Sequence, residues 1–530
     1  MTRPGPGRLL LGLMAGGKAS VSGRVPSLSE PSSRETYVTE MRGPTIVRSA
    51  TARSARRETV LATTRALCPV CLAVCPGESL ERDGKVVLRR TCLEHGVRES
   101  LVLSDAEWWK WSRKFLRPGR RPEPATATEH GCPYDCGFCP EHEQHACVTV
   151  FEITESCNLA CPACFAGDAH AVHRSLDEID AMATALLRAE GGSADVVMLS
   201  GGEPTLHPQF LDIVDRIGAL PVRYVIVNSN GVRFAREPDL ARQVAERGAL
   251  VYLQFDGFEA STYEALRGRA DLLDTKLAAL ANLGAAGARV VLVATIVKGV
   301  NDHEIGAVVR FGAEHPAVRA VSLQPQFGEG RFVAFDAMDR MTITDVIAAV
   351  DRDSGLFTRE DFVPVPCCDP MCTAATYAYV RDGKVTPVTR LVPVETYLDY
   401  LENSAMPNLS EAYREDMEEM REVLLRLYSK GSPPGTERQA SAFFCACEPL
   451  LDEFDSVDDL SDHVFAVTIE GFMDRHVFDV SRVTRCCIQE ALPDGRIIPF
   501  CAYNTLYRFA PDHRPLPPGI APGDAPGAAS

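Results

Sequence analysis

The stretch VTVFEITESCNLACPACF, residues 148 to 165, joins a short apolar run to three closely spaced cysteines. Its first residues are rich in β-branched and aromatic side chains, which predicts a buried β-strand. Cys157, Cys161 and Cys164 then follow the spacing CxxxCxxC, so one loop can present three thiolates to one metal centre. A 4Fe–4S cluster has four irons, and this loop therefore leaves one iron without a thiolate ligand.

Further strand-like runs follow the first one, and segments of helical pattern separate them. The predicted strands are VTVFEIT (148–154), DVVMLS (195–200), VRYVIVN (222–228), LVYLQFDG (250–257), VVLVATIV (290–297) and AVSLQPQF (320–327). Strands that alternate with helices predict right-handed βαβ units and a parallel sheet. We expect an α/β fold, a partial (β/α)6 TIM-type barrel over residues 148–335, with an open doubly wound sheet as the alternative. In both folds the functional site lies at the C-terminal ends of the strands, where the cysteine run stands.

The composition is that of a folded protein with more than one domain. The chain has 530 residues, 45% of them hydrophobic and 24% charged, which is enough for about two to four domains with their own cores. The net charge of −17 would repel phosphate groups, so we expect no nucleic-acid partner. No segment has the run of about 18 apolar residues that a membrane-spanning helix needs.

Nineteen cysteines are present, and most fall into tight local groups. Cysteines so close together rarely make good disulfide partners but readily share a metal. We therefore expect metal ligation and a reducing, cytoplasmic location. The aromatic stretch WWKW (108–111) suggests either internal packing or peripheral contact with a membrane surface.

The first cysteine group predicts a metal-binding β-ribbon domain over residues 58–120. CPVC and CLEH flank the strand-like segment KVVLRRT, an arrangement in which two short ligand loops hold one tetrahedral metal ion. A thiolate-rich site of this kind accepts structural zinc or a rubredoxin-like iron. The expected ligands are Cys68, Cys71 and Cys92, with His95 or Cys75 as the fourth.

The second group, GCPYDCGFCPEHEQHAC (131–147), contains another CxxxCxxC run and predicts an auxiliary iron–sulfur segment over residues 121–147. Four protein ligands would close the cluster, which suits electron transfer. The expected ligands are Cys132, Cys136, Cys139 and Cys147, and His142 or His145 is the alternative if Cys147 is a structural thiol.

The C-terminal third predicts a second auxiliary-cluster domain over residues 336–509. PCCDPMC (366–372) and RCCIQEALPDGRIIPFC (485–501) carry paired cysteines that are far apart in the chain, so we expect one discontinuous site. The expected ligands are Cys367, Cys372, Cys486 and Cys501, with Cys368 and Cys487 as rivals. Cys445 and Cys447 are as well explained as small core residues, and residues 409–430 read as an amphipathic helix.

The two ends of the chain predict little structure. Residues 1–57 contain a faint signal-peptide outline, but their Ser, Arg, Thr and Pro content better fits a disordered extension, or a start codon placed too early with Met41 as the true start. Residues 510–530 read as a disordered tail.

Glycine-rich and polar motifs follow the next predicted strands: SGGEP (200–204), NSNG (228–231) and QFDG (254–257). Together with the CxxxCxxC run, they make the chain resemble the radical S-adenosylmethionine (SAM) superfamily. The competing interpretation of the cysteine run is a zinc site or a cluster used only for electron transfer.

The resemblance implies that the amino and carboxylate groups of SAM chelate the fourth iron, and that an electron from the cluster then yields a 5′-deoxyadenosyl radical. Glu203 is then expected to accept a hydrogen bond from the amino group, next to a backbone that two glycines leave open. The implied SAM contacts are Gly201, Gly202, Glu203, Pro204, Asn228, Asn230 and Asp256. The superfamily often has an aromatic residue before the last cysteine, whereas here Ala163 stands there and Phe165 follows.

The motifs CPxC, CxxHG, GCPxxCGxCPxH, CNLxCPxCFA, GGEPT and PDGRxIPFCAYN together resemble a narrower branch, the archaeal tetraether lipid synthases, whose members are also described as dihydropterin methylases. The resemblance covers residues 68 to about 507. It implies a rubredoxin-like metal, the SAM cluster, two auxiliary 4Fe–4S clusters and a reducing partner such as ferredoxin or flavodoxin. Only a strong hydrogen-atom abstractor can open an unactivated C–H bond, so such equipment fits the chemistry.

Three functions follow from the sequence. The favoured one is hydrogen abstraction from a lipid alkyl chain with carbon–carbon bond formation. The second is radical methylation of a small pterin-like heterocycle. The third is a non-catalytic multi-cluster electron carrier, which would have no use for the GGEP motif. A lipid needs a long apolar tunnel and a pterin a short polar slot, so the pocket distinguishes the first two.

Overall fold

The small N-terminal sheet is a meander of four antiparallel strands. They are β1 (Glu58–Leu67), β2 (Val74–Arg82), β3 (Lys85–Cys92) and β4 (Gly96–Leu103), in the order β1-β2-β3-β4. Asp83 and Gly84 join β2 to β3 with positive φ angles of 51° and 73°, the conformation that a tight two-residue hairpin requires. The short loops around these strands carry the first cysteine group.

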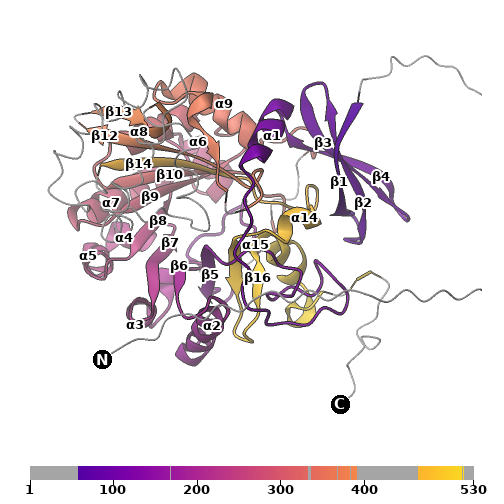
Figure 1. The fold of residues 1–530 in the computed structure, drawn as a ribbon. Helices are drawn as coiled ribbons and strands as arrows, with labels where there is room; N and C mark the ends of the chain where they lie inside the picture. The colour runs from indigo at the N-terminus through magenta and orange to yellow at the C-terminus, as the bar shows by residue number, and fades with distance from the viewer. Residues whose placement is uncertain are drawn as a thin grey trace, which may run out of the picture. The chain divides into compact units, whose positions relative to one another are not determined.

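Figure 1 shows the fold in the computed structural model, which describes residues 58–167, 169–331, 336–366, 368–381, 383–390, 463–515 and 517–518. All of these belong to one compact unit. Several predictions lie outside the described residues: the N-terminal extension, the helix at 409–430, most of the C-terminal tail, and the roles of Cys367, Cys445 and Cys447.

Helix α1 (Ala106–Ser112) connects the small sheet to the rest of the protein. Asp105 caps it by accepting hydrogen bonds from two backbone N–H groups of the first turn. Trp108 and Trp109 are only 3% and 8% exposed, so these two aromatic side chains pack inside the protein.

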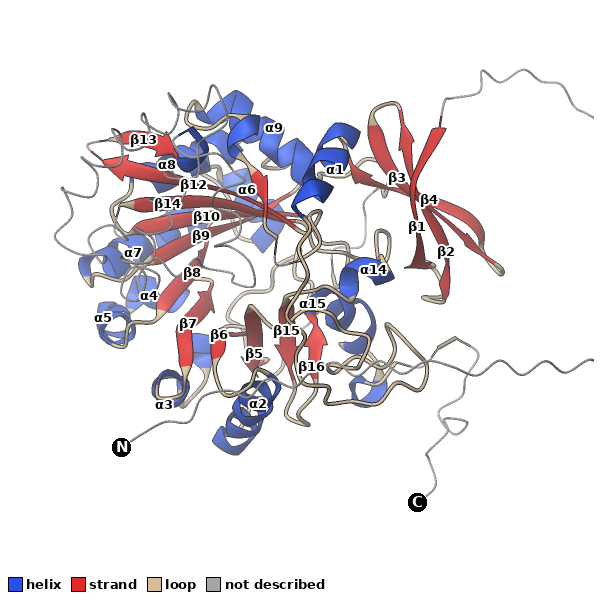
Figure 2. Cartoon of the chain, viewed as in Figure 1, coloured by secondary structure: helices blue, strands red, loops and turns tan. Residues whose placement is uncertain are grey.

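All six predicted strands are present and parallel, in the order of the sequence. They are β5 (Val148–Thr154), β6 (Ala194–Gly201), β7 (Val222–Ser229), β8 (Leu250–Gln254), β9 (Val290–Ile296) and β10 (Val318–Pro325). The helices between and after them are α2 (Leu176–Ala189), α3 (Phe210–Gly218), α4 (Val232–Arg236), α5 (Pro238–Glu246), α6 (Ala260–Arg267), α7 (Leu272–Ala285), α8 (Ile305–Glu314) and α9 (Ile343–Ser354). Figure 2 shows α3, α4, α5 and α7 along the outer side of the sheet.

The sheet has more strands than the six predicted, because the C-terminal segment returns to both of its edges. β14 (Val464–Glu470) pairs in parallel with β10, and β15 (Ile488–Ala491) pairs in parallel with β5. The remaining strands pair antiparallel outside these: β11 (Val363–Pro364), β12 (Thr373–Arg381), β13 (Lys384–Pro387) and β16 (Ile497–Pro499). In Figure 1 the yellow β14 lies beside the orange β10 and β12, and the yellow β16 lies near β5.

Short helical segments complete the fold. They are η1 (Arg113–Phe115), η2 (Pro204–Leu206), η3 (Arg359–Asp361), η4 (Val388–Arg390), α14 (Val480–Val483), α15 (Phe500–Ala502), the π-type η6 (Tyr503–Tyr507) and η7 (Pro511–His513). Among the described residues, no helix is both long and apolar enough to cross a membrane.

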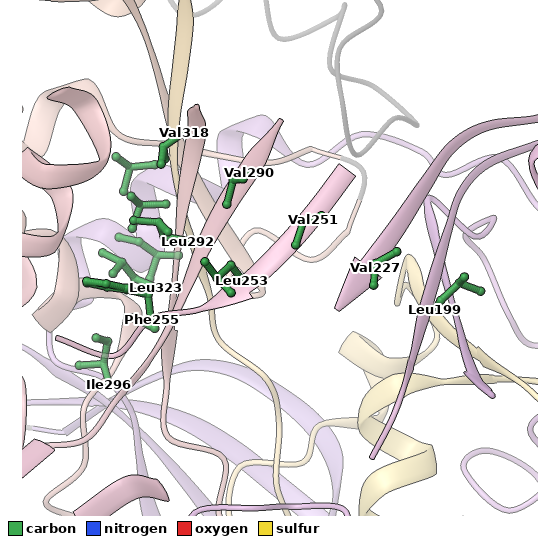
Figure 3. Packing of buried hydrophobic residues seen from close by; sticks show 14 of the residues in the cluster. Leu199, Val227, Val251, Leu253, Phe255, Val290, Leu292, Ile296, Val318 and Leu323 are labelled. Carbon is green, nitrogen blue, oxygen red and sulfur yellow. The ribbon is translucent and has the colours of Figure 1, made fainter. Parts of the chain in front are cut away.

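The main core lies between the parallel strands and the helices. Val227, Val251, Leu253, Val290 and Leu292 are nearly inaccessible to water and lie side by side on neighbouring strands (Figure 3). Their packing fixes which face of each strand is buried, because a slip of one residue would turn every side chain to the other face. The opposite face of the same strands is therefore free to line a cavity.

Candidate active site and metal centres

A cavity of about 470 Å³ lies against the inner face of the parallel sheet. Alternate residues of a strand line this cavity, such as Val148, Val150 and Glu152 of β5. Residues of β14 and of β15 line it as well. Strands at both ends of the parallel array can border one cavity only if the sheet curves around it, which supports the partial-barrel prediction over a flat open sheet.

The cavity wall changes character along the strands. In the direction of the chain, the cavity is lined first by Met198, Tyr252 and Val293. Two residues later on the same strands it is lined by Ser200, Gln254 and Thr295. Polar groups therefore gather at the C-terminal strand ends, where parallel α/β folds carry their chemistry, and apolar groups lie deeper.

The three cysteines of the CxxxCxxC run lie on the loop after β5, and all three line the cavity. Their thiols are free and half-buried. Burial raises the pKa of Cys157 and of Cys161, and Arg267 beside Cys161 opposes this effect. Three thiols on one loop, open to one cavity, fit a 4Fe–4S cluster whose fourth iron takes a small-molecule ligand.

Gly201 and Gly202 allow a close approach between two parts of the chain itself. A Cβ atom on Gly201 would lie 2.1 Å from the carbonyl oxygen of Thr154, and one on Gly202 would lie 2.3 Å from that of Ser156. The N–H groups of Gly202 and Glu203 donate to these same two carbonyls, at 2.8 and 2.7 Å. The glycines thus hold the start of the cysteine loop against the end of β6.

The side chain of Glu203 is not placed as the sequence suggested. It is 1% exposed, and its carboxylate accepts four hydrogen bonds from within the chain. The donors are the N–H and hydroxyl of Thr205 at 3.3 and 2.5 Å, the Ser229 hydroxyl at 2.8 Å and the Asn230 N–H at 2.7 Å. Glu203, which the sequence predicts as a SAM contact, ties the end of β7 to the GGEP loop through these bonds.

The asparagines of the NSNG motif do face the cavity. The Asn228 side chain donates to the Ser200 hydroxyl at 3.2 Å, and that of Asn230 donates to the Asn158 side chain at 2.7 Å. Asn230 therefore connects the end of β7 to the cysteine loop. Pro204 does not line the cavity and instead begins the short helix η2, where its fixed φ angle is suitable.

Asp256, another predicted SAM contact, is paired with a neighbouring cation. Its side chain is fully buried and forms a two-point ion pair with Arg267, at 2.6 and 2.8 Å. Arg267 in turn lines the cavity beside Cys161. The sequence reasoning missed Arg267, because nothing local distinguishes it from the chain's other arginines.

Lys276 on α7 is a second residue that the sequence did not single out. It is buried, and its ammonium group donates to the Asn230 carbonyl and to the Gln254 side chain. Burial lowers the pKa of Lys276 to about 8. One buried cation thus fixes two residues of the cavity wall.

The N-terminal ribbon assembles one predicted metal site. The ligand atoms of Cys68, Cys71, Cys92 and His95 all lie within 4.8 Å of one another. The Cys71 and Cys92 sulfurs are 3.8 Å apart, and the Cys92 sulfur lies 3.6 Å from His95 Nδ1. Ligands about 2.3 Å from a tetrahedral zinc ion are separated by about 3.8 Å, so the residues fit such an ion. Cys75 donates to the Ala66 carbonyl instead, which favours His95 as the fourth ligand.

The structure places Cys132, Cys136 and Cys139 on one buried loop, which Tyr507 holds by accepting from the Cys136 N–H at 2.8 Å. It does not bring Cys147 to them. Cys147 packs with Cys368, Cys372 and Cys487, beside β15. Of the two alternative histidines, His142 lines a small pocket together with these three cysteines while its Nε2 contacts the Cys486 carbonyl, and His145 contacts Glu190.

In the C-terminal segment, Cys372, Cys486 and Cys501 lie near one another. Cys486 and Cys501 share a hydrogen bond, which is the main cause that raises the pKa of Cys486, and the Cys372 sulfur accepts from Arg482 at 3.3 Å. Cys368 is a close neighbour of Cys372. Segments more than a hundred residues apart thus bring three of the four predicted thiols near one another, and the fourth, Cys367, lies outside the described residues.

The curved parallel sheet with three cavity-facing thiols is the arrangement of the radical SAM superfamily, whose family model matches residues 151–312. The chain belongs to this superfamily. A second model, the HMPTM N-terminal zinc ribbon domain, matches residues 60–104.

Among relatives, the chain is similar to the 7,8-dihydro-6-hydroxymethylpterin dimethyltransferase of Methanocaldococcus jannaschii, with 33% identity over 477 residues, 84% of this chain and 94% of the relative. It is also 31% identical over 176 residues to the GTP 3′,8-cyclase of Chlorobaculum tepidum, covering 33% of this chain and about half (52%) of that one. A solved structure, Streptococcus suis SuiB bound to the precursor peptide SuiA, matches with a TM-score of 0.34 and 14% identity over 40% of this chain and 46% of its own.

Proposed function

We propose that this chain is a radical SAM methylase of a dihydropterin-like heterocycle. The observation that carries the proposal is the likeness to the pterin dimethyltransferase along nearly the whole of both chains. The cavity supports it, because about 470 Å³ with polar groups at one end suits a compact ligand beside SAM. Carbon–carbon bond formation on a lipid, which the sequence favoured, has no comparable support among these relatives.

When bound, the cluster and SAM together supply a one-electron cleavage of the sulfonium and a radical that abstracts hydrogen from carbon. The chain's own groups hold and orient them. Cys157, Cys161 and Cys164 provide the thiolates. Arg267, oriented by Asp256 and lying beside Cys161, is the cavity-lining cation that we assign to the SAM carboxylate, and a charge-assisted hydrogen bond there would fix its position.

The polar residues of neighbouring strands would position the rest of SAM. Asn228 and Asn230 present amide groups to the cavity, and Lys276 holds the Asn230 backbone from behind. The aromatic ring of Phe165, one residue beyond the last cysteine of the run, also lines the cavity and offers a flat surface for a base. These contacts replace those first assigned to Glu203 and Asp256.

Two auxiliary clusters and one N-terminal metal complete the proposal. Burial of Cys132, Cys136 and Cys139 supports the first cluster, and the proximity of Cys372, Cys486 and Cys501 supports the second. The ribbon metal is most simply zinc, since three thiols and one imidazole at tetrahedral spacing suit it. A ferredoxin- or flavodoxin-type reductant would deliver electrons.

The test uses the anaerobically reconstituted full chain with a low-potential reductant, 6-hydroxymethyl-7,8-dihydropterin and excess SAM, which would serve both as the radical source and, in a second equivalent, as the methyl donor. Mass spectrometry should detect 5′-deoxyadenosine together with a methylated pterin. Cleavage of SAM with no methylated pterin, combined with altered alkyl-chain lipids in cells that carry the gene, would return the lipid reaction to first place. No cleavage of SAM at all would favour the electron carrier.

A further inference from the structure

Glu470, the last residue of β14, carries a carboxylate on the cavity wall that has no cationic partner among the described residues. Glu152 on β5 lines the same cavity but is neutralised by Arg508, with two hydrogen bonds of 2.6 and 3.0 Å. The difference matters because a carboxylate withdrawn from water costs free energy unless donors surround it.

The contacts of Glu470 leave acceptor positions free. The Gln324 side chain donates to Oε2 at 2.9 Å, the Thr468 hydroxyl lies 3.5 Å from Oε1, and the Ser322 hydroxyl also donates to the carboxylate. A carboxylate has about four acceptor positions, so Glu470 can still accept from a ligand, and the long Thr468 contact is the one that a second ligand donor would replace. Burial raises the pKa of Glu470, and the hydrogen bonds from uncharged side chains oppose this rise only in part.

The surroundings of Glu470 are flat and apolar on one side. Phe472 follows it on the chain, and its ring lies 4.8 Å from that of Phe500 and 6.5 Å from that of Phe327. All three rings line the cavity. A run of aromatic faces and edges is a surface on which a planar heterocycle stacks.

A hydrogen-bond donor lies just beyond the end of β10, the strand that pairs with β14. Gln326 follows β10 two residues after Gln324 and lines the cavity. Its side-chain N–H₂ group is buried and has no hydrogen-bond partner among the described residues. Unsatisfied buried donors are rare in folded proteins and call for a partner.

We propose that Glu470 is the specificity-determining residue for a 2-amino-4-oxopyrimidine ring, accepting hydrogen bonds from its 2-amino group and N3–H while Gln326 donates to the 4-oxo oxygen. The inference rests on the proposed function and deepens it. The two donors and one acceptor on that ring edge match a carboxylate beside an amide. An alkyl chain has none of these groups and would add no donor to the carboxylate of Glu470.

The experiment compares two ligands on two forms of the protein. The full chain, reconstituted and saturated with SAM, is titrated with 6-hydroxymethylpterin and with its 2,4-dioxo counterpart, in which oxygen replaces the 2-amino group. The wild type should bind the amino compound at least about tenfold more tightly, since two donors to one carboxylate discriminate strongly. Glu470→Gln, which turns one acceptor into a donor, should reduce that preference to within about twofold.

Glu155→Gln is the matched control, because it makes the same change in the same cavity at an exposed position. It should keep the wild-type preference. If Glu470→Gln kept the full wild-type preference for the amino compound, the inference would be overturned and the proposed function would stand. The same holds if the wild type bound the two ligands equally, and this second result can be obtained even if the variant fails to fold. A wild type that binds neither ligand would overturn the proposed function as well.

Discussion

Replacing Lys276 by methionine should alter how stability depends on pH. The ammonium group is buried near Asp256 and Glu203, which favour its charge, and near Arg267, which opposes it. Burial is the dominant cause and lowers the pKa from 10.5 to about 8. Because the folded state then binds the proton more weakly than the unfolded state, the charged form destabilises the fold below pH 8, and this cost disappears as the pH rises toward 10.5.

The size of the effect follows from the shift. A change from 10.5 to about 8 corresponds to about 3.4 kcal/mol in total, of which about 1.3 kcal/mol should be recovered between pH 7 and pH 9. The wild type should gain this stability over that interval and Lys276→Met should not. At pH 7 the variant loses two hydrogen bonds but also the cost of a buried charge, so its stability should be close to that of the wild type.

The assay is anaerobic denaturant unfolding of both proteins at several pH values, with the difference taken at each pH so that shared titrating groups cancel. A difference that stays constant between pH 7 and pH 9 would refute the reasoning. The same variant should bind SAM more weakly, since the Asn230 carbonyl and the Gln254 side chain lose the group that holds them.

Four further outcomes are expected. Cys161→Ala should lose the cluster and release no 5′-deoxyadenosine, whereas Cys75→Ala, a buried thiol outside the proposed ligand sets, should retain both by iron analysis and chromatography. Arg267→Met should weaken SAM binding by about ten- to a hundredfold in equilibrium titrations, and it should destabilise the fold by leaving Asp256 buried without its partner. Adding Asp256→Asn removes that unpaired charge, so the double variant should regain stability but not SAM affinity. His95→Ala should lose the ribbon metal by elemental analysis, and His95→Cys should keep it. Reconstituted protein should hold about twelve irons for three clusters, and about four irons would remove the auxiliary sites.

The predicted parallel strands agree with the observed ones because a short stretch of sequence is sufficient to predict each strand. Each core strand is a run of Val, Ile and Leu, and each is followed by a helix, so the βαβ order can be read directly. The strands added by the C-terminal segment could have been found in part. VFAVTIE in β14 alternates as a strand does, and the Asp494–Gly495 turn between β15 and β16 is a hairpin signal. Their parallel pairing with opposite edges of the sheet has no local signal.

The functional residues also divide into those that a local motif predicts and those that only the tertiary structure places. The spacing of Cys157, Cys161 and Cys164 within one loop was sufficient to identify a cluster site, because ligands a few residues apart must lie together wherever the loop goes. The GGEP motif was recognised for a good reason, but its Glu203 turned out to hold the chain rather than to face the cavity.

By itself, the sequence determined the alternating strands and helices, the loop that offers three thiolates and the ligand pairs of the metal ribbon. Periodicity and short spacing encode all of these within a few residues. Only the tertiary structure decided that Asp256 pairs with Arg267, that Cys147 packs beside Cys487 rather than with Cys139, and that Glu470 faces the cavity without a cation. Partners of buried charges and thiols come from distant segments, and which segments meet depends on how the whole chain buries its apolar faces.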